Sequence, residues 1–438
     1  MKINLLIVTI LIIRCLLADK SLRVVIRCPY LELRQRLSIT SNGWYIPWLN
    51  SENSSTRKIF TDHYFMYNFL KLNLPNNEFC SIEEPDQFAT MNPSAMWIEE
   101  KKMFLAVVRI NINRNKSFLW ASWYDSDWKE VITEEFIGNT AVPGIIPIKI
   151  PNLYLLNAGP EDPRIFRALG NQVFVLFNMF DYDEMRKMWI YNFNTAECYP
   201  LSIRYHKEQA YFSEKNWTPF IVDDEHLYFI YNYKNFQIID CTVKGENCSW
   251  KSGGYERLPE GLRGGSPYLQ YKNTSYYVNL GYSHIFYVKD TNWCHLYRPC
   301  LTLAQYIDEE PNFRLIYTSE PIDFSNKLFL KPITKYSEMS EVGMCGDGRI
   351  MIPLSIARWN YEEDIADITV SINDTIPLAL KVSGLAEIVD EVIFWYEKGS
   401  LPKEENCAER LAYWDVGLTQ PQKPRFNVRK IKPNSEKP

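Results

Sequence analysis

Four x-Pro steps recur along the chain, and a small or polar residue precedes each proline. The residues before the prolines are Asn92, Asp162, Thr218 and Ser266. Asp162 is the carboxylate of this set, so it is the candidate for general base or general acid. An Asp-Pro step is also typical of a turn or a strand cap, and spacing alone favours that simpler interpretation.

Several arginines near these steps are candidates for binding phosphate or sugar, because a guanidinium forms paired hydrogen bonds with either. They are Arg109, Arg164, Arg263 and Arg298. Any single arginine is more often a solvated or ion-paired surface residue. Arg164 and Arg263 lie inside the segments that contain Asp162 and Ser266, which favours a functional interpretation for these two.

Polar and aromatic residues in the same segments are further candidates for sugar binding. Asn92, Asn216 and Ser266 can hydrogen-bond a sugar, and His284 can bind phosphate or a hydroxyl, although a structural histidine fits His284 equally well. Trp217 and Tyr268 either stack on a sugar ring or belong to the core. Asn216 also begins an Asn-x-Thr glycosylation sequon, but we expect it to be unmodified because Pro219 follows and the segment lines the predicted site.

Two Asp-x-Asp pairs have the composition of a divalent-cation site on a nucleotide sugar. They are Asp125 with Asp127 and Asp181 with Asp183. The pattern is short and common, and it belongs to α/β enzymes, which this chain does not resemble. We therefore interpret both pairs as exposed turns and predict no metal ligands and no cofactor.

The elements that must position these residues are short hairpins. The x-Pro steps lead into strands that turn and return, and a fifth copy without proline runs from Val342–Cys345 through Gly346–Gly348 to Ile350–Leu354. Aromatic residues make up 15% of the chain, which fits strands. We predict an all-β, five-bladed β-propeller in which the first strand of each blade lines the axis and brings the x-Pro residues together. A sandwich with capped strands is the alternative.

The chain divides into four predicted parts. Residues 1–18 resemble a signal peptide or a short signal anchor, residues 19–88 form an irregular extension packed on the propeller, residues 89–417 form the propeller, and residues 418–438 are a disordered, basic, proline-rich tail. A leader and six sequons indicate the secretory pathway, with membrane contact only if the leader stays uncleaved.

Nine cysteines beyond the leader predict disulfides, among which Cys241–Cys248 and Cys294–Cys300 are near in sequence. The net charge of −5 gives no reason to expect nucleic-acid binding.

Five segments in one order resemble the β-mannoside phosphorylases and hydrolases that share a five-bladed propeller. The segments are Asn92–Ala95 with Arg109, Gly159–Ile165, Lys215–Phe220, Gly264–Pro267, and Tyr297–Pro299 with Leu315–Ile322. A second resemblance is to the fungal β-1,2-mannosyltransferases. It rests on Leu262–Pro267, Tyr297–Pro299, Ile322–Phe324 and Ile356–Trp359 followed by Asp367 and Asp374.

The resemblance implies an inverting β-mannosyltransferase of the Golgi lumen or a secreted one, with Asp162 as the base. It would transfer mannose from GDP-mannose to a mannose-containing glycan acceptor. The phosphorylases carry a phosphate-binding histidine where Gly281 lies here, and His284 comes three residues later. This difference favours a transferase over a phosphorylase or hydrolase. A glycan-binding propeller without activity is the remaining alternative.

Overall fold

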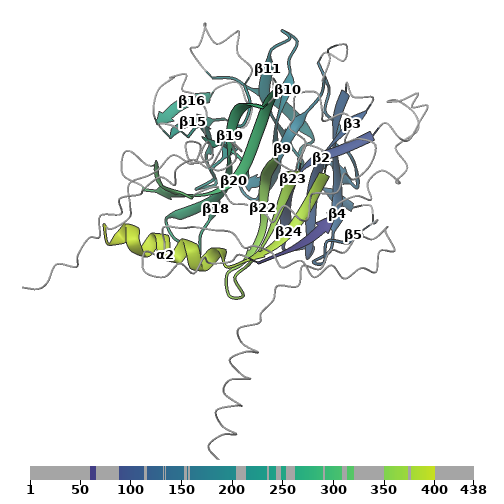
Figure 1. Cartoon of the computed structure of the whole chain (residues 1–438). Coiled ribbons are helices and arrows are strands. Elements are labelled where there is room, and N and C mark those ends of the chain that lie inside the picture. The colour runs from purple at the N-terminus through teal and green to yellow at the C-terminus, as the bar shows by residue number, and fades with distance from the viewer. Residues whose placement is uncertain are drawn as a thin grey trace, which may run out of the picture.

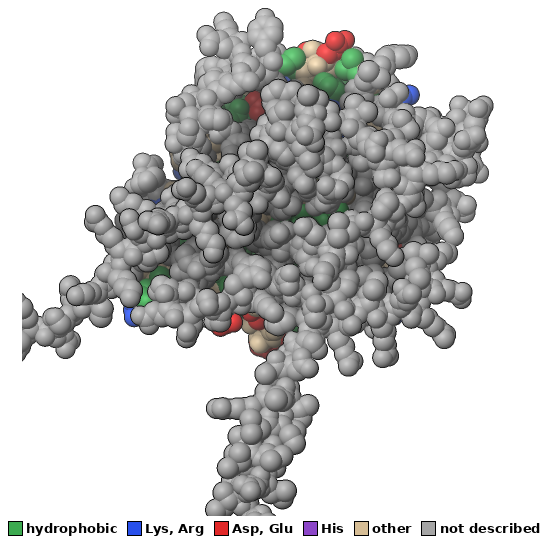
Figure 2. Space-filling view, in the orientation of Figure 1, with side chains coloured by type: hydrophobic (Ala, Val, Ile, Leu, Met, Phe, Trp, Pro, Cys, Tyr) green, Lys and Arg blue, Asp and Glu red, His purple; other side chains and the backbone are tan. Residues whose placement is uncertain are grey.

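The computed structural model describes residues 60–65, 88–319 and 350–399, with short gaps inside the last two ranges. Within them, strands form five antiparallel sheets of four or five strands, and one helix, α2 (Leu385–Glu397), lies beside them (Figure 1). Figure 2 shows the molecule in the same orientation, with the described side chains coloured by type. Each sheet is built from strands in chain order, except that the fifth also takes β1, so each sheet is a blade and the fold is a five-bladed β-propeller. This confirms the predicted fold class.

The first two blades contain the residues nearest to Asp162. The first blade is β2 (Phe88–Ile98), β3 (Met103–Ile112), β4 (Lys116–Tyr124) and β5 (Glu130–Val131), with β8 (Gly144–Ile145) also paired to β4. The second blade is β9 (Glu161–Ala168), β10 (Gln172–Phe180), β11 (Arg186–Asn192) and β12 (Glu197–Leu201). Between them lies a hairpin of β6 (Glu135–Ile137) and β7 (Thr140–Val142).

The other three blades follow the same plan. The third is β13 (Thr218–Pro219), β14 (Leu227–Asn232), β15 (Gln237–Cys241) and β16 (Cys248–Ser252). In the fourth, β17 (Leu262–Arg263) and β18 (Leu269–Gln270) both pair with β19 (Tyr276–Lys289), which continues to β20 (Asn292–Tyr306) and β21 (Phe313–Thr318). The fifth is β22 (Met351–Asn360), β23 (Ile365–Ile372) and β24 (Ile376–Ser383), completed by β1 (Phe60–Phe65).

The blades pack because strands such as β10 are apolar on both faces. Val175 and Phe177 pack in one cluster with Trp123 of the first blade. Phe174 and Leu176 point to the other side and pack with residues of the third blade that include Phe229 and Ile239. Successive side chains of a strand point to opposite faces, so a nearly continuous apolar run gives a sheet that is buried between two neighbours.

The first strand of each blade lies at the axis, as expected. β2 contacts both β9 and β22, and β9 contacts β13. Serine and threonine hydroxyls join neighbouring blades near the axis: Ser94 of β2 accepts the Ile165 N–H of β9 at 3.0 Å, and Thr369 of β23 donates to the carbonyl of Pro93 in β2 at 2.6 Å. These bonds fix the inner strands around the axis and therefore fix the x-Pro residues.

The fifth blade corrects one prediction. Ile350–Leu354 was expected to be the return strand of a hairpin that turns at Gly346–Gly348, but Met351–Leu354 begins β22, the inner strand, and β22 pairs with β23 across the turn at Tyr361–Asp364. Residues 342–349 lie outside the described residues. The fifth blade also has a proline, Pro353, beside a register shift. The Gly-Asp-Gly composition predicted a hairpin turn before Ile350. The strand pairing instead follows the two apolar runs of β22 and β23, which pair with each other.

The ring is completed by a strand from the other end of the chain. β1 pairs antiparallel with β24, from Phe60 opposite Ser383 to Phe65 opposite Leu378. Residues 60–65, which were predicted to belong to an irregular extension packed on the propeller, therefore supply the outer strand of the fifth blade. The leader and the tail from residue 418 lie outside the described residues, and none of the helices in the described part has the length and apolarity to cross a membrane.

The cysteines agree with one of the two proposed pairings. Cys241 and Cys248 form a disulfide between the neighbouring strands β15 and β16. Cys294 and Cys300 cannot pair, because both lie in the continuous strand β20, where six residues span about 20 Å and a disulfide needs Cα atoms within about 7 Å. Cys300 is disulfide-bonded, and Cys198 is a free thiol whose burial raises its pKa to about 12.

Helix α2 takes its cap from a distant turn. Its N-cap residue, Gly384, has no side chain to accept the free N–H groups of the first turn. The carboxylate of Asp364 accepts them instead, from Ala386 N–H at 2.7 Å and Glu387 N–H at 3.4 Å. The β22–β23 turn thus ties the helix to the fifth blade.

We predict that Asp364→Ala destabilises the protein by about 1 kcal/mol, the usual value of a helix cap, and lowers Tm by roughly 1–3 °C. Asp364→Asn is the matched control, because asparagine keeps the capping oxygen and tolerates the left-handed conformation of this residue (φ 48°). Differential scanning calorimetry compares the two variants. Equal Tm values for Asp364→Ala and the unaltered protein would contradict the capping role.

Candidate active site

The inner strands bend sharply at the x-Pro steps. Asn92 and Asp162 both have φ of 53°, in the left-handed region, and so does Asn216, two residues before the third x-Pro step, with φ of 65°. Asn and Asp reach this region more easily than other residues with a side chain. The register of β2 with β3 and of β9 with β10 shifts at these points, as in a β-bulge. Bulges re-aim side chains, and strained backbone is concentrated at functional sites.

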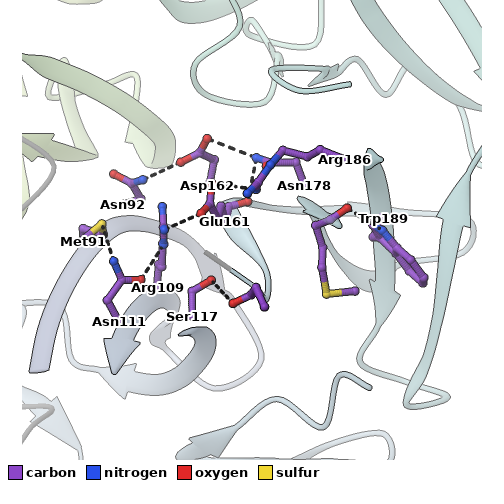
Figure 3. A network of polar contacts seen from close by, with 12 residues as sticks. Met91, Asn92, Arg109, Asn111, Ser117, Glu161, Asp162, Asn178, Arg186 and Trp189 are labelled. Carbon is purple, nitrogen blue, oxygen red and sulfur yellow. Dashed lines mark hydrogen bonds and ion pairs between the residues drawn. The ribbon is translucent and has the colours of Figure 1, made fainter. Parts of the chain in front are cut away.

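The Asp162 carboxylate is held by two amides. Asn92 Nδ2 donates to its Oδ1 at 2.6 Å, and Asn178 Nδ2, from β10, donates to its Oδ2 at 3.3 Å (Figure 3). Asn92 and Asn178 are buried, whereas Asp162 keeps part of its surface exposed. The first and second blades therefore fix one accessible carboxylate at the axis. This agrees with the predicted meeting of Asn92 and Asp162.

The neighbouring carboxylate, Glu161, binds two arginines. Its Oε1 is 2.6 Å from Arg109 Nη2, and its Oε2 is 2.8 Å from Arg186 Nη1 (Figure 3). The three side chains are only 12% (Arg109), 16% (Glu161) and 10% (Arg186) exposed. Arg186 also stacks over the Phe180 ring at 4.3 Å and donates to Asn178 Oδ1 at 2.5 Å. Glu161 and Asp162 thus have different partners although they are adjacent in sequence.

Arg164 has a different role from the one expected. It has no exposed surface, and it donates to the carbonyls of Gly265 at 2.7 Å, Gly264 at 2.8 Å and Asp162 at 3.1 Å. The guanidinium therefore joins the second blade to the fourth and is not presented to a ligand. The glycines are required by the close approach: a Cβ on Gly264 would lie 1.7 Å from Thr218 Oγ1, and one on Gly265 would lie 2.0 Å from the carbonyl of Leu280.

Asn216 lies at the axial end of the third blade and is buried. Its Oδ1 accepts a hydrogen bond from the hydroxyl of Tyr282 at 2.9 Å. Its Nδ2, like Oδ1 of Asn92, is a buried polar atom without a hydrogen-bond partner among the described residues. Buried polar groups are nearly always paired, so these two atoms are suited to a ligand. Tyr282 is also buried, which raises its pKa, and the charges of Arg164, Arg263 and Asp162 act on it.

Other predicted site residues are structural. Trp217 is 1% exposed and packs against Phe229 and Tyr231, so its ring belongs to the core and does not form a sugar platform. Ser266 is fully buried, and its hydroxyl accepts the Leu280 N–H at 3.0 Å.

The remaining predicted residues lie in the fourth blade. His284 stacks on Tyr297, opposite it in the sheet, with ring centroids 4.5 Å apart. Arg263 lies in β17 opposite Tyr282 and is half-buried. Arg298 lies opposite Ser283 in β20, and its side chain is outside the described residues. Arg263 is thus the arginine of this blade that the described contacts bring near Tyr282.

Both Asp-x-Asp pairs lie in turns, as expected. Asp125 Oδ1 accepts the N–H groups of Asp127 and Lys129, both at 2.9 Å. Asp181 and Asp183 lie between β10 and β11, and both contact Lys187, at 2.5 and 2.7 Å. Asp125 therefore has partners from its own turn, and Asp181 and Asp183 have a partner in the strand that follows theirs.

Sequence reasoning missed several residues of the cluster. Asn178 and Arg186 lie in β10 and β11, outside the x-Pro steps, and Glu161 was not among the predicted site residues. The x-Pro pattern marks inner strands alone, so it cannot identify a side chain that reaches the axis from the second or third strand. Arg186 in the apolar run of β11 was the available signal, because a charged residue in a buried strand needs a partner.

Comparison with known proteins identifies relatives. The family model of "Beta-mannosyltransferases" matches residues 181–410, which is more than half of the chain. Beta-mannosyltransferase 4 of Komagataella phaffii is 25% identical over 337 residues, covering 69% of this chain and 64% of that protein. Beta-mannosyltransferase 3 of Candida albicans is 26% identical over 340 residues, covering 68% of this chain and 59% of that protein. The chain thus spans less than two thirds of the length of these relatives.

Solved structures that resemble the chain include a β-1,2-mannobiose phosphorylase from Listeria innocua in complex with β-1,2-mannobiose. It has a TM-score of 0.44 and 11% identity, and the match covers 76% of this chain and 99% of that one. A mannose phosphorylase from Leishmania mexicana has a TM-score of 0.43 and 10% identity, with 69% and 86% covered. The match of the family model confirms the resemblance inferred from the sequence: the chain belongs to the β-mannosyltransferase family.

Proposed function

We propose that the protein is an inverting β-mannosyltransferase that moves mannose from GDP-mannose to a mannose-containing glycan. The observation that carries the proposal is the Asp162 carboxylate, which is fixed at the propeller axis by two amides and remains partly exposed. Membership of the β-mannosyltransferase family supports the transferred sugar and the linkage.

The geometry of Asp162 suits a general base. A carboxylate can accept about four hydrogen bonds, and each oxygen of Asp162 accepts one amide N–H from the described residues. Lone pairs therefore remain for the hydroxyl of an acceptor sugar. As that oxygen attacks the anomeric carbon of mannose, its proton passes to Asp162, and the bond from the anomeric carbon to the diphosphate of GDP breaks on the opposite face. Attack from that face inverts the configuration.

Two asparagines supply complementary contacts to a sugar. Oδ1 of Asn92 is an acceptor and Nδ2 of Asn216 is a donor, and both are buried without a partner among the described residues. A sugar hydroxyl both donates and accepts, so it can satisfy either atom. These atoms favour a polyhydroxy ligand over an apolar one.

The leaving diphosphate needs positive charge. Arg109 and Arg263 are the candidates among the described residues. Arg164 is fully buried on backbone carbonyls, whereas Arg263 is half-buried and Arg109, although it binds Glu161, keeps 12% of its side chain exposed. His284 and Arg298 stay as candidates on the fourth blade. We propose that these groups act without a divalent cation. We also propose that the reaction occurs in the secretory pathway, in the Golgi lumen or outside the cell.

Asp162→Asn should remove most turnover while the protein stays folded, because the amide cannot take a proton. A general base is worth roughly 10²–10⁴-fold. Release of GDP from GDP-mannose in the presence of a mannan acceptor measures turnover, and a parallel reaction with phosphate in place of nucleotide tests for a phosphorylase. Asp240→Asn, in β15 of the third blade, is the matched control and should be fully active. Near-normal turnover by Asp162→Asn would exclude Asp162 as the base.

Activity should survive dialysis against EDTA, since Asp181 and Asp183 already contact Lys187 and arginines can serve the diphosphate. The measurement is GDP release before and after EDTA, with added Mn²⁺ as the second arm. A complete loss that Mn²⁺ restores would assign the metal to Asp181 and Asp183 and overturn this prediction.

Asn216 should carry no glycan after expression through the secretory pathway. It is 7% exposed and its side chain is bonded to Tyr282, whereas a glycan needs an exposed asparagine. Asn273, exposed in the β18–β19 turn, is the matched sequon that can accept one. Glycopeptide mass spectrometry gives the occupancy of each site. High occupancy at Asn216 would place this segment on the outside of the molecule.

A further inference from the structure

The cluster around Asp162 divides its charges unequally. Two guanidinium groups, from Arg109 and Arg186, bind Glu161, while Asp162 receives only neutral amides (Figure 3). A charge-assisted hydrogen bond is roughly twice as strong as a neutral one. A guanidinium that is free of Glu161 would therefore displace an amide from Asp162.

A single side chain, that of Asn178, lies between Arg186 and Asp162. Its Nη1 donates to Asn178 Oδ1 at 2.5 Å, and Asn178 Nδ2 donates to Asp162 Oδ2 at 3.3 Å. Asn178 also donates to the backbone carbonyl of Glu161 at 3.2 Å. The amide thus separates the cation from the carboxylate, and its orientation depends on the position of Arg186.

We propose that Glu161 is a positioning residue that holds Arg109 and Arg186 away from Asp162, so that the Asp162 carboxylate stays available to accept a proton. This inference rests on the proposed function of Asp162. A carboxylate clamped by a guanidinium has fewer lone pairs to offer and is a weaker base. Without Glu161, the buried guanidinium of Arg109 would lose its ion pair, and Arg186 would lose one of its partners. Asp162 is linked to Arg186 through Asn178 and is the adjacent carboxylate on the same strand.

The first test is the crystal structure of the full-length Glu161→Gln protein. We expect the guanidinium of Arg109 or Arg186 to hydrogen-bond the Asp162 carboxylate in place of Asn92 or Asn178. If both guanidinium groups stay on the glutamine or turn to solvent while Asp162 keeps its two amides, the proposal is wrong. This result does not depend on turnover, so it is informative even if the protein does not use GDP-mannose.

The second test is a double-mutant cycle in kcat. Glu161→Gln should lower kcat by roughly 10- to 100-fold, within the range for loss of a general base. Adding Arg186→Gln removes one cation and keeps an amide that can bind Asn178, so the double variant should recover about tenfold over Glu161→Gln. Such recovery is a coupling between the two sites. If the fold-losses in kcat of Glu161→Gln and Arg186→Gln multiply in the double variant, the two residues act independently, and Glu161 is merely structural.

Glu135→Gln is the matched control for both tests. Glu135, in β6, forms an ion pair with Lys101 and is 30% exposed, so its substitution removes a carboxylate and a salt bridge away from the axis. Its kcat should equal that of the unaltered protein. A loss of kcat in Glu135→Gln similar to that in Glu161→Gln would show that removal of any ion pair lowers activity, and the proposal would fall.

Discussion

The buried guanidinium of Arg164 is the constraint on which the axial site depends. It joins β9 of the second blade to the Gly264–Gly265 turn of the fourth, and it also binds the carbonyl of Asp162 itself. A buried charge without such partners would be costly, and a hydrogen bond to a charged group typically contributes about 1.5–3 kcal/mol. The bonds therefore hold two blades and the peptide of Asp162 in one geometry. The close approach of the blades at this turn requires glycine at 264 and 265, since any side chain there would overlap the third blade or β19.

The left-handed backbone of Asp162 follows from this constraint. Arg164 fixes the carbonyl of Asp162, and Asn92 and Asn178 fix its carboxylate, so strain in the backbone is held by bonds from two blades. A catalytic group needs a fixed orientation, and fixing it in advance avoids reorganisation during the reaction. The adjacent Glu161 forms ion pairs with Arg109 and Arg186. The two adjacent carboxylates of one strand thus serve different purposes, because bending at the proline sends them to different neighbours.

The sequence predicted the fold and part of this site for a physical reason. Proline cannot donate to a sheet, so x-Pro steps mark edge strands, and in a propeller the inner strand is an edge. The pattern predicted that Asn92, Asp162 and Asn216 lie at the axis. It gave position along the strand without the direction of the side chain, so it could not decide whether Trp217 stacks on a sugar or belongs to the core, and it did not show that Ser266 is buried. It also treated Arg164 as a ligand contact, since a guanidinium that binds backbone carbonyls has the same sequence signature as one that binds phosphate. Asn178 and Arg186 reach the axis from strands with no such mark.

The stereochemistry of the product tests the central claim most directly. The purified protein is incubated with GDP-mannose, whose mannose is α-linked, and with a mannan oligosaccharide, and the new linkage is examined by NMR at its anomeric carbon. Attack by an acceptor that Asp162 deprotonates, on the face opposite the diphosphate, predicts a β-linked mannose. An α-linked product would require retention, which a single displacement with Asp162 as the base cannot give, and it would contradict the proposed mechanism.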